Sequence, residues 1–316
     1  MIVISADDVR SVLTPAACIE AMDRAMRAVY RGDVDVPPRQ FVPVAGTDGA
    51  SLGLMPGSSA DLEVYGAKIL SLHRDNNEKG FPAIQGFVCL FDRDNGLPLA
   101  MVEGATLTAL RTAAASALAT RALARSDATS HGVFGTGVQA RSHVDAVATV
   151  RDIRRVVIWG RRACAVEALV DALRADYDFD IVAAADARDA AACDIVSTVT
   201  ASTEPVVQGS WIRPGAHVNL VGAHESHTRE ADSRLMKRAR VYVDLLASAL
   251  REAGDILIPI AEGAIAATDI VGEIGALVEG DIGGREARDD ITVYKSLGIV
   301  AQDLYAADYV LRQLRQ

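Results

Sequence analysis

A glycine-rich run near the middle of the chain has the residue types and the spacing needed to hold a phosphate-bearing nucleotide. The run is Gly132-Val-Phe-Gly135-Thr136-Gly137-Val138-Gln139-Ala140, and from Gly135 it has the form GxGxxA. In such a loop the first glycine permits a tight turn from strand to helix, and the second lets the backbone approach a pyrophosphate. The small third residue lets the helix and the strand pack closely. Free N–H groups at the start of the next helix would bind the phosphates.

The loop stands in the sequence context that this function requires. An apolar run precedes it, a helical run over residues 139–150 follows it, and a second strand is expected over residues 156–159. We therefore predict a βαβ unit that begins near residue 130 and binds a nicotinamide dinucleotide. The alternative is a glycine turn that serves packing only.

The residues after the second strand favour a dinucleotide that carries a 2′-phosphate on its ribose. A carboxylate that binds the ribose 2′-hydroxyl normally ends this strand, but the chain continues with Gly160, Arg161 and Arg162. Guanidinium groups suit a 2′-phosphate, which a carboxylate would repel. We therefore expect NADP(H) in preference to NAD(H), with NAD(H) still possible. Two alternatives are that both arginines are solvated surface charges, and that Asp186 ends the relevant strand if the strands are counted differently.

Other parts of the sequence predict the elements that position this loop. Residues 5–31 have a helical pattern, with Thr14 as N-cap, Pro15 at a first helical position and Gly32 at the end. Residues 36–103 predict an antiparallel sheet of several strands, with a hairpin turn at residues 92–96. Residues 105–124 predict a long buried helix. Residues 130–298 alternate short apolar and helical runs, and residues 299–316 predict an amphipathic helix.

This order of elements predicts an α/β protein with two domains. A Rossmann-type, mostly parallel sheet domain over residues 116–298 is inserted in an α+β domain formed by residues 1–115 and 299–316. The length of 316 residues also suits about two domains.

The composition limits the classes of partner that this protein is expected to bind. The net charge of −10 disfavours nucleic acid. No apolar stretch is long enough for a membrane span, and no signal peptide begins the chain. The four cysteines lie far apart without metal-binding spacing, so we expect no metal site and reduced, buried or half-buried thiols in a cytoplasmic protein. A catalytic thiol is the minor alternative.

Several blocks in the right order resemble the ornithine cyclodeaminase/μ-crystallin family over nearly the whole chain. The blocks are residues 111–115 (RTAAA), 135–140 (GTGVQA), 197–200 (STVT), 214–222 (PGAHVNLVG) and 294–298 (YKSLG). The resemblance implies a homodimer in which the first domain binds substrate and dimerises, with the C-terminal helix packed back on it. It also implies chemistry at the α-carbon of an amino acid, with hydride moved to or from a nicotinamide.

The resemblance also implies roles for particular residues. Arg39, Lys68 and Arg111 match substrate-site cations that would grip the carboxylate of an α-imino acid; without the family match, a lysine among apolar neighbours is more often structural. The implied cofactor-binding residues are Thr112, Gly135, Thr136, Gly137, Val138, Gln139, Arg161, Arg162, Thr198, Val199, Val221 and Ser296.

One departure from the family decides the expected reaction. The cyclodeaminases carry an Asp after the Asn-Leu-Val-Gly strand, where this chain has His224. Because an imidazole does not simply replace a carboxylate base beside a cationic amine, we expect a ketimine reductase. Such an enzyme would reduce Δ1-pyrroline-2-carboxylate or Δ1-piperideine-2-carboxylate to the L-amino acid, with Lys68, Arg111 and His224 as the catalytic residues. The alternatives, in order, are an alanine-dehydrogenase-like enzyme, an ornithine cyclodeaminase, and a crystallin-like NADP(H) binder without turnover.

Overall fold

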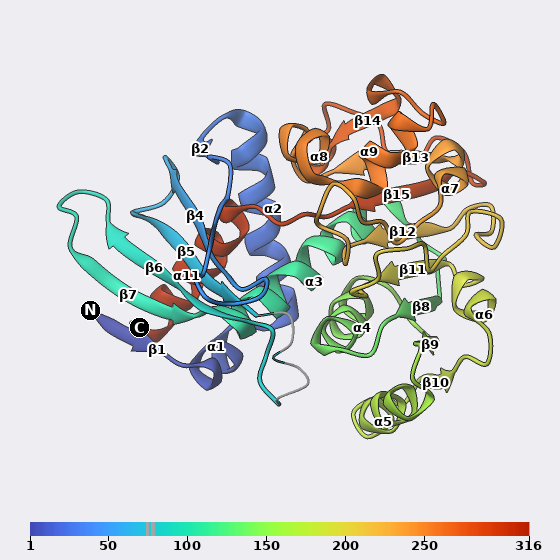
Figure 1. The fold of residues 1–316 in the computed structure, drawn as a ribbon, viewed down its shortest axis with the longest axis horizontal. Coiled ribbons are helices and arrows are strands. Elements are labelled where there is room, and N and C mark those ends of the chain that lie inside the picture. The colour runs from blue at the N-terminus through green and yellow to red at the C-terminus, as the bar shows by residue number, and fades with distance from the viewer. Residues whose placement is uncertain (74–75, 77–79, 316) are drawn as a thin grey trace. The chain divides into compact units, whose positions relative to one another are not determined.

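The computed structural model describes residues 1–73, 76 and 80–315. The chain forms two compact units, one of Met1–Arg111 with Gly298–Gln316 and one of Thr112–Leu297 (Figure 1). The first boundary lies inside the long helix α3 (Gly104–Leu123), four residues before the position expected from the sequence. None of the helices in the described part of the chain combines the length and the apolar character needed to cross a bilayer.

A largely antiparallel sheet forms the first unit. Its order is β1-β7-β6-β5-β4-β2, with β3 also paired to β4. The strands are β1 (Ile2–Ile4), β2 (Val34–Asp35), β3 (Gln40–Pro43), β4 (Ser51–Ser59), β5 (Val64–Leu72), β6 (Ile84–Asp92) and β7 (Pro98–Glu103). The predicted turn joins β6 to β7, where Asp92 accepts hydrogen bonds from the backbone of Asp94 and Asn95. The sequence pattern did not predict β1, because three residues carry little periodicity and their partner strand β7 is distant in the chain.

Helices cover one face of this sheet. The predicted helical region is two helices, α1 (Ala6–Val12) and α2 (Pro15–Arg31), because Thr14 leaves the helical conformation to cap the second. The C-terminal helix α11 (Val300–Leu314) packs against α2, β4 and β5 (Figure 1). The prediction that α11 is amphipathic was wrong in one respect. Its polar residues Gln302, Asp303 and Asp308 are buried with its apolar ones.

The second unit is built on a parallel sheet with the order β10-β9-β8-β11-β12-β15-β13-β14. The strands are β8 (Ser130–Phe134), β9 (Arg155–Trp159), β10 (Asp180–Ala183), β11 (Ile195–Thr198), β12 (His217–Leu220), β13 (Ala239–Val243), β14 (Ile270–Glu273) and β15 (Ile291–Lys295). The chain turns back from β10 past β8 to β11, so the strand order reverses between β8 and β11. Ligands of open parallel sheets bind at the carboxyl ends of the strands at such a point.

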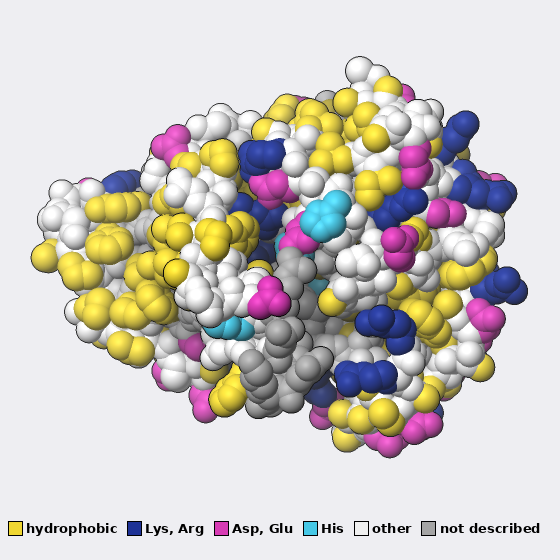
Figure 2. Space-filling view, in the orientation of Figure 1, with side chains coloured by type: hydrophobic (Ala, Val, Ile, Leu, Met, Phe, Trp, Pro, Cys, Tyr) yellow, Lys and Arg dark blue, Asp and Glu magenta, His cyan; other side chains and the backbone are white. Residues whose placement is uncertain are grey.

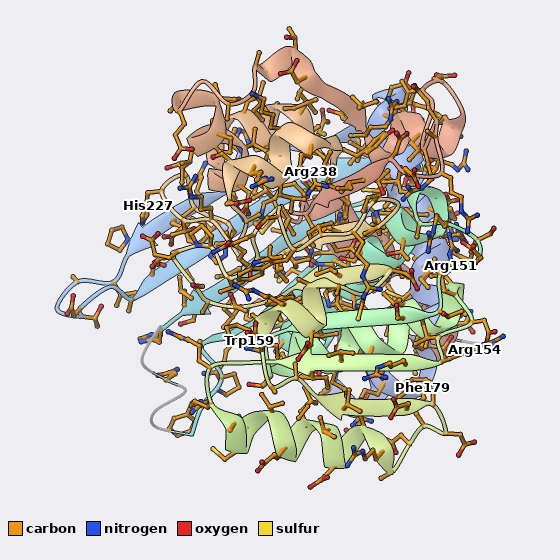
Figure 3. All side chains as sticks on the ribbon, turned by 90° about the vertical axis from the view of Figure 1, so that its right-hand side faces the viewer. Arg151, Arg154, Trp159, Phe179, His227 and Arg238 are labelled. Carbon is orange, nitrogen blue, oxygen red and sulfur yellow. The ribbon has the colours of Figure 1, made fainter. Side chains whose placement is uncertain are left out.

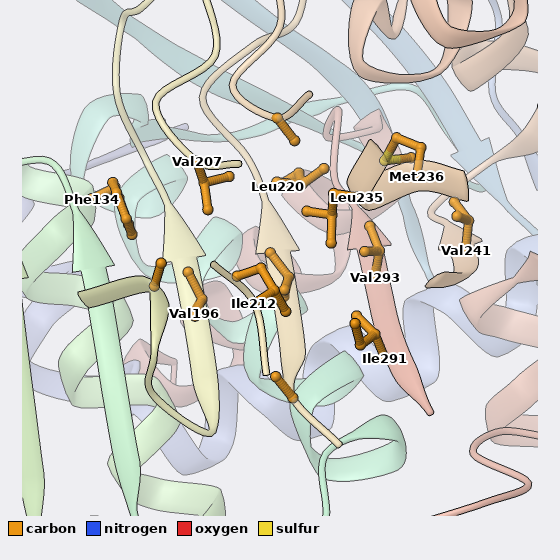
Figure 4. Packing of buried hydrophobic residues seen from close by; sticks show 14 of the residues in the cluster. Phe134, Val196, Val207, Ile212, Leu220, Leu235, Met236, Val241, Ile291 and Val293 are labelled. Carbon is orange, nitrogen blue, oxygen red and sulfur yellow. The ribbon is translucent and has the colours of Figure 1, made fainter. Parts of the chain in front are cut away.

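Short helices flank this sheet and enclose its core. They are α4 (Val138–Val150), α5 (Ala163–Arg174), α6 (Ala187–Ala191), α7 (Ser233–Arg238), α8 (Leu246–Glu252), α9 (Gly254–Ala261) and α10 (Ile274–Glu279). On one face, Phe134, Val196, Leu220 and Val293 come from four adjacent strands and pack with residues of the covering segments (Figure 4). This burial supports the predicted Rossmann-type sheet, because parallel strands that are covered on both faces are rich in apolar residues.

Candidate active site

The glycine loop joins β8 to α4 in the second unit, as the sequence predicted. Gly135 has φ +128°, and its N–H donates to the carbonyl of Trp159 at 2.9 Å. A Cβ atom on Gly135 would lie 2.9 Å from the carbonyl oxygen of Val199. A larger residue is therefore excluded by both the backbone conformation and the neighbouring strand.

Gly137 is glycine for a different reason. A Cβ atom there would meet no protein atom within 4 Å, and its backbone conformation is open to any residue. The protein itself therefore does not require glycine at this position. Glycine suits this position as the N-cap of α4, and it also fits the second glycine of a dinucleotide loop, where a ligand approaches the backbone closely. That binding role stays a prediction.

Helix α4 begins directly after this glycine and offers unpaired backbone donors. Gly137 is its N-cap and has no side chain to accept from the first turn. Val138, the first helical residue, is 69% exposed. The start of a helix carries free N–H groups and a partial positive charge, which together bind phosphate. The loop and helix start therefore fit the pyrophosphate of a dinucleotide.

The cofactor-binding residues expected on other strands lie at the same edge of the sheet. Thr198 pairs with Phe134 on one side and with Leu220 on the other. Beyond the strand ends, the N–H groups of Val199, Val221 and Ser296 donate to the carbonyls of Phe134, Thr198 and Leu220, at 2.9–3.0 Å. The structure therefore brings these three positions to the carboxyl ends of β11, β12 and β15. Thr112, on α3, is 8% exposed, and its cofactor contact stays a prediction.

The end of β9 resolves the question of the strand count. β9 pairs directly with β8 and ends at Trp159, which Figure 3 labels. Gly160 follows, and then Arg161 and Arg162, which are exposed. Asp186 follows the third strand, β10, and caps helix α6 by accepting from the backbone of Arg188 at 2.8 Å. Asp186 therefore does not end the second strand, and among the described residues no carboxylate directly follows β9.

A buried carboxylate holds two of the loops at this edge. Both oxygens of Glu230 are used: Oε1 accepts from the N–H and the hydroxyl of Thr200, and Oε2 accepts from the hydroxyl of Thr198 and the N–H of Gly222. These bonds are 2.6–2.8 Å long. Burial raises the pKa of the Glu230 carboxyl above its usual range, and Asp255 adds to that effect. The four donors stabilise the ionised form against this cost.

A buried ion pair stabilises the loop after β12 at the same edge of the sheet. Lys295, the last residue of β15, donates to Asp255 at 2.9 Å and to the carbonyl of Ala223. Asp255 in turn accepts from the backbone N–H groups of Glu230 and Ala231. The loop after β12, which leads to His224, is therefore fixed at Gly222 by Glu230 and at Ala223 by Lys295.

A second cluster of charged groups lies within the first unit. Lys68 of β5 and Arg111 of α3 are 3% and 5% exposed. Both donate to one oxygen of Asp303 on α11, with Lys68 Nζ and Arg111 Nε each 3.1 Å from Oδ1. Arg111 Nη1 also donates to Gln302 Oε1 at 2.8 Å. The second oxygen of Asp303, Oδ2, is buried and has no hydrogen-bond partner among the described residues.

The cluster adjusts the proton affinity of Lys68. Burial lowers the pKa of Lys68 to about 8; Asp303 opposes that effect, while the charges of Arg111 and Arg39 add to it. Lys68 is thus close enough to both arginines to sense their charges. An amine with a pKa near neutral pH can both give and take a proton under working conditions.

The predicted residues outside these clusters have varied surroundings. His224 is exposed and lies after β12, with Nδ1 3.1 Å from the carbonyl of Gly222, and its part in proton transfer stays a prediction.

The cysteines are free; Cys164 is exposed, which corrects the expectation of buried or half-buried thiols. The described residues contain no group of three side chains suited to a metal ion.

Sequence reasoning missed the residues that position the expected ones. Asp303 and Gln302 were counted only as part of a helix, Lys295 was named only within the block of residues 294–298, and Asp255 was not considered. Their partners are distant in the chain, so no local spacing could have paired them. Two of these residues carried a signal, since Lys295 lies in the block of residues 294–298 and Glu230 lies in the Arg-Glu-Ala-Asp run of residues 229–232, which also resembles the family.

Comparison with known proteins agrees with this arrangement. The family model described as "Ornithine cyclodeaminase/mu-crystallin family" matches residues 1–316. A Delta(1)-pyrroline-2-carboxylate reductase of Paracoccus denitrificans is 38% identical over 268 residues, which cover 84% of each chain. The ketimine reductase mu-crystallin of Rattus norvegicus is 35% identical over 312 residues, covering 97% of this chain and 95% of the relative.

A solved structure extends the comparison to three dimensions. It is the Delta(1)-pyrroline-2-carboxylate reductase of Thermococcus litoralis in complex with NADH and L-proline. It superposes with a TM-score of 0.96 at 34% identity, covering 100% of this chain and 98% of that one.

Proposed function

We propose that this chain, which belongs to the ornithine cyclodeaminase/μ-crystallin family, reduces a cyclic α-imino acid to the corresponding L-amino acid with a reduced nicotinamide cofactor. The observation that carries the proposal is the buried pair of Lys68 and Arg111 on one oxygen of Asp303. Burying two cations is costly unless an anion compensates them. The cluster holds the two cations Lys68 and Arg111 against one carboxylate, and so favours a second negative group such as the carboxylate of the substrate.

In this mechanism the two units supply different groups. Residues at the carboxyl ends of β8, β9, β11, β12 and β15 would hold the cofactor, which supplies a hydride when bound. Arg111 and Arg39 bind and orient the carboxylate of the substrate, which accounts for much of the rate through positioning. Lys68 gives a proton to the imine nitrogen, which makes the neighbouring carbon electrophilic, and regains it from solvent afterwards. Hydride on carbon and a proton on nitrogen complete the reduction of the C=N bond.

A panel of substrates tests this function. With purified protein and NADPH, we expect turnover of Δ1-pyrroline-2-carboxylate or Δ1-piperideine-2-carboxylate, measured by the loss of reduced nicotinamide absorbance. Pyruvate with ammonia, and ornithine with oxidised cofactor, serve as the comparison substrates. Strong turnover of alanine or pyruvate without any turnover of the cyclic imines would assign an alanine-dehydrogenase-like reaction instead.

We favour NADP(H) over NAD(H) for this chain. Arg161 and Arg162 are exposed directly after β9, where a 2′-phosphate would lie, and no carboxylate stands there to repel it. One charge-assisted hydrogen bond contributes about 1.5–3 kcal/mol, which is about ten-fold or more in affinity. In the same panel, kcat/KM for NADPH should therefore exceed that for NADH by about ten-fold. An equal or higher value with NADH would overturn this preference.

We propose further that the protein is a homodimer formed through the uncovered face of the first sheet. Strands β4 to β7 place apolar side chains on that face, opposite the helices. Figure 2 shows hydrophobic side chains gathered over these strands. They are Leu52, Leu54, Tyr65, Ile69, Phe87, Phe91, Leu99 and Met101, all at least partly exposed. Contiguous apolar patches of this kind mark protein interfaces, and a second copy of the same face supplies a matching surface.

A substitution in this face tests the dimer. Tyr65 is 37% exposed and stacks on Phe91 with ring centroids 5.6 Å apart. The Tyr65→Glu variant should shift the mass measured by analytical ultracentrifugation from two chains to one, because like charges would meet across a two-fold axis. Leu250→Glu on α8 is the control, since Leu250 is also 37% exposed but lies in the second unit. A monomeric wild-type protein would refute the proposal.

A further inference from the structure

We propose that Asp303 is the positioning residue that keeps Lys68 protonated and aimed for proton delivery to the imine nitrogen. This inference deepens the proposed function and rests on it. Asp303 lies on the C-terminal helix α11, which the sequence marked only as an amphipathic element. Its role follows from the contacts of its carboxylate rather than from any motif.

One oxygen atom of Asp303 joins the two buried cations. Oδ1 accepts from Lys68 Nζ and from Arg111 Nε at 3.1 Å each, and the carboxylate is fully buried. Because both donors meet the same atom, Asp303 fixes the ammonium group of Lys68 relative to the guanidinium group of Arg111. A side chain as flexible as lysine needs such a partner to keep one direction.

Without Asp303, the groups around Lys68 would favour its neutral form. Arg111 reaches it from α3, and the positive charge of Arg39 also acts on it; both lower its pKa. Its neighbours across the sheet, Met55 on β4 and Val88 on β6, are apolar and supply no compensating charge. Asp303 is therefore the anionic group within the described residues that favours the charged form of Lys68.

The second oxygen of Asp303 accepts from neither of the two cations. Oδ2 is buried without a hydrogen-bond partner in the described part of the chain. A buried carboxylate oxygen of this kind leaves room for a further donor, such as a water molecule or a group of the substrate. By contrast, Asp308, five residues further along α11, is 3% exposed and pairs with Arg312 at 2.8 Å. Asp308 thus provides a matched control on the same helix.

The inference predicts opposite effects of pH on the two reaction directions. Imine reduction needs protonated Lys68, so its rate should fall as the pH rises through the pKa of about 8. Amino-acid oxidation needs neutral Lys68, so its rate should rise over the same range. Removal of the Asp303 charge lowers the pKa of Lys68 further, because the favourable partner of the ammonium group is lost. Both transitions should therefore move to lower pH.

The experiment compares wild-type protein with Asp303→Asn and Asp308→Asn. Profiles of kcat against pH are recorded for the cyclic imine with NADPH and for the amino acid with NADP+. We expect Asp303→Asn to shift both transitions to lower pH by about one unit or more and to lower kcat for reduction at pH 8 by about five-fold or more. Asp308→Asn should keep both transitions at their wild-type positions. Thermal unfolding of each variant separates loss of fold from loss of function.

A direct titration makes the result independent of turnover. The sequence contains four lysines, so protein labelled with 13C at lysine Cε gives a simple spectrum, in which Lys68→Met identifies the Lys68 signal. That signal should titrate at lower pH in Asp303→Asn than in wild type. Should the Asn variant not fold, Asp303→Ser, which leaves room for water beside the cations, is measured instead with the same expected shift.

The outcomes separate the inference from the function on which it rests. An unshifted Lys68 signal and unshifted pH profiles in a folded Asp303 variant would overturn the role of Asp303, even if kcat fell. Absence of cyclic-imine turnover in the wild-type protein would instead refute the proposed function, whatever the lysine titration showed.

Discussion

Replacement of Lys68 by methionine should lower kcat for cyclic-imine reduction by about 10²–10⁴-fold, the usual contribution of a positioned general acid. Methionine fills nearly the same volume among the apolar neighbours of β5 but carries no proton to give. Arg111 still pairs with Asp303 at 3.1 Å in this variant, so the buried carboxylate keeps one cation. Initial rates with saturating NADPH and imine measure the change.

The cofactor affinity should be unaffected by the same substitution. Every residue assigned to the nucleotide lies in Thr112–Leu297, whereas Lys68 belongs to the other unit. Calorimetric titration should therefore give a Kd for NADPH within about two-fold of wild type. Lys237→Met is the control, because Lys237 is an exposed lysine on α7. Turnover that survived in Lys68→Met would disprove the proton-transfer role of this lysine.

Replacement of Gly137 by alanine should weaken NADPH binding by about 10–100-fold without destabilising the protein. A Cβ atom at this position meets no protein atom within 4 Å, so the folded chain tolerates it. The methyl group would instead occupy the space through which the pyrophosphate approaches the backbone. Loss of one charge-assisted hydrogen bond, about 1.5–3 kcal/mol, gives the expected range.

Gly283→Ala provides the matched control for this prediction. A Cβ atom on Gly283 also meets nothing within 4 Å, and this glycine lies in the same unit but outside the nucleotide loop. Both variants should unfold at the wild-type temperature when no cofactor is present. Only Gly137→Ala should show the loss of affinity in calorimetric titration, and equal affinity in the two variants would exclude a phosphate-binding role for Gly137.

Much of the architecture could be predicted because its signals are local. The alternation of apolar and helical runs after residue 130 predicted the parallel sheet, and Gly135 and Gly137 predicted the turn into α4. Thr14 and Gly32 marked the two ends of α2 through capping preferences that depend on a few adjacent residues. The missed strand β1 shows the limit, since three residues become a strand only through pairing with β7.

In the candidate site, too, some residues could be predicted from the sequence and others could not. Lys68, Arg111 and the loops after β11 and β12 could be named because their types and blocks resemble a family. The carboxylates that hold them could not, since Glu230 and Asp303 contact partners far away in the sequence. A polar residue in a helical run is normally assigned to the solvent side. Burial of Asp303 therefore became visible only once α11 was packed against β5.

The sequence by itself determined the type of most elements, the nucleotide loop and the positive groups available for an acid substrate, because these depend on residues near one another in the chain. Tertiary structure alone decided which charges meet: it placed Asp303 between Lys68 and Arg111, and Glu230 beneath the loops at the carboxyl edge of the sheet. The physical reason is that the energy of a charged group depends on burial and on its nearest partners. Both are set by the packing of distant segments.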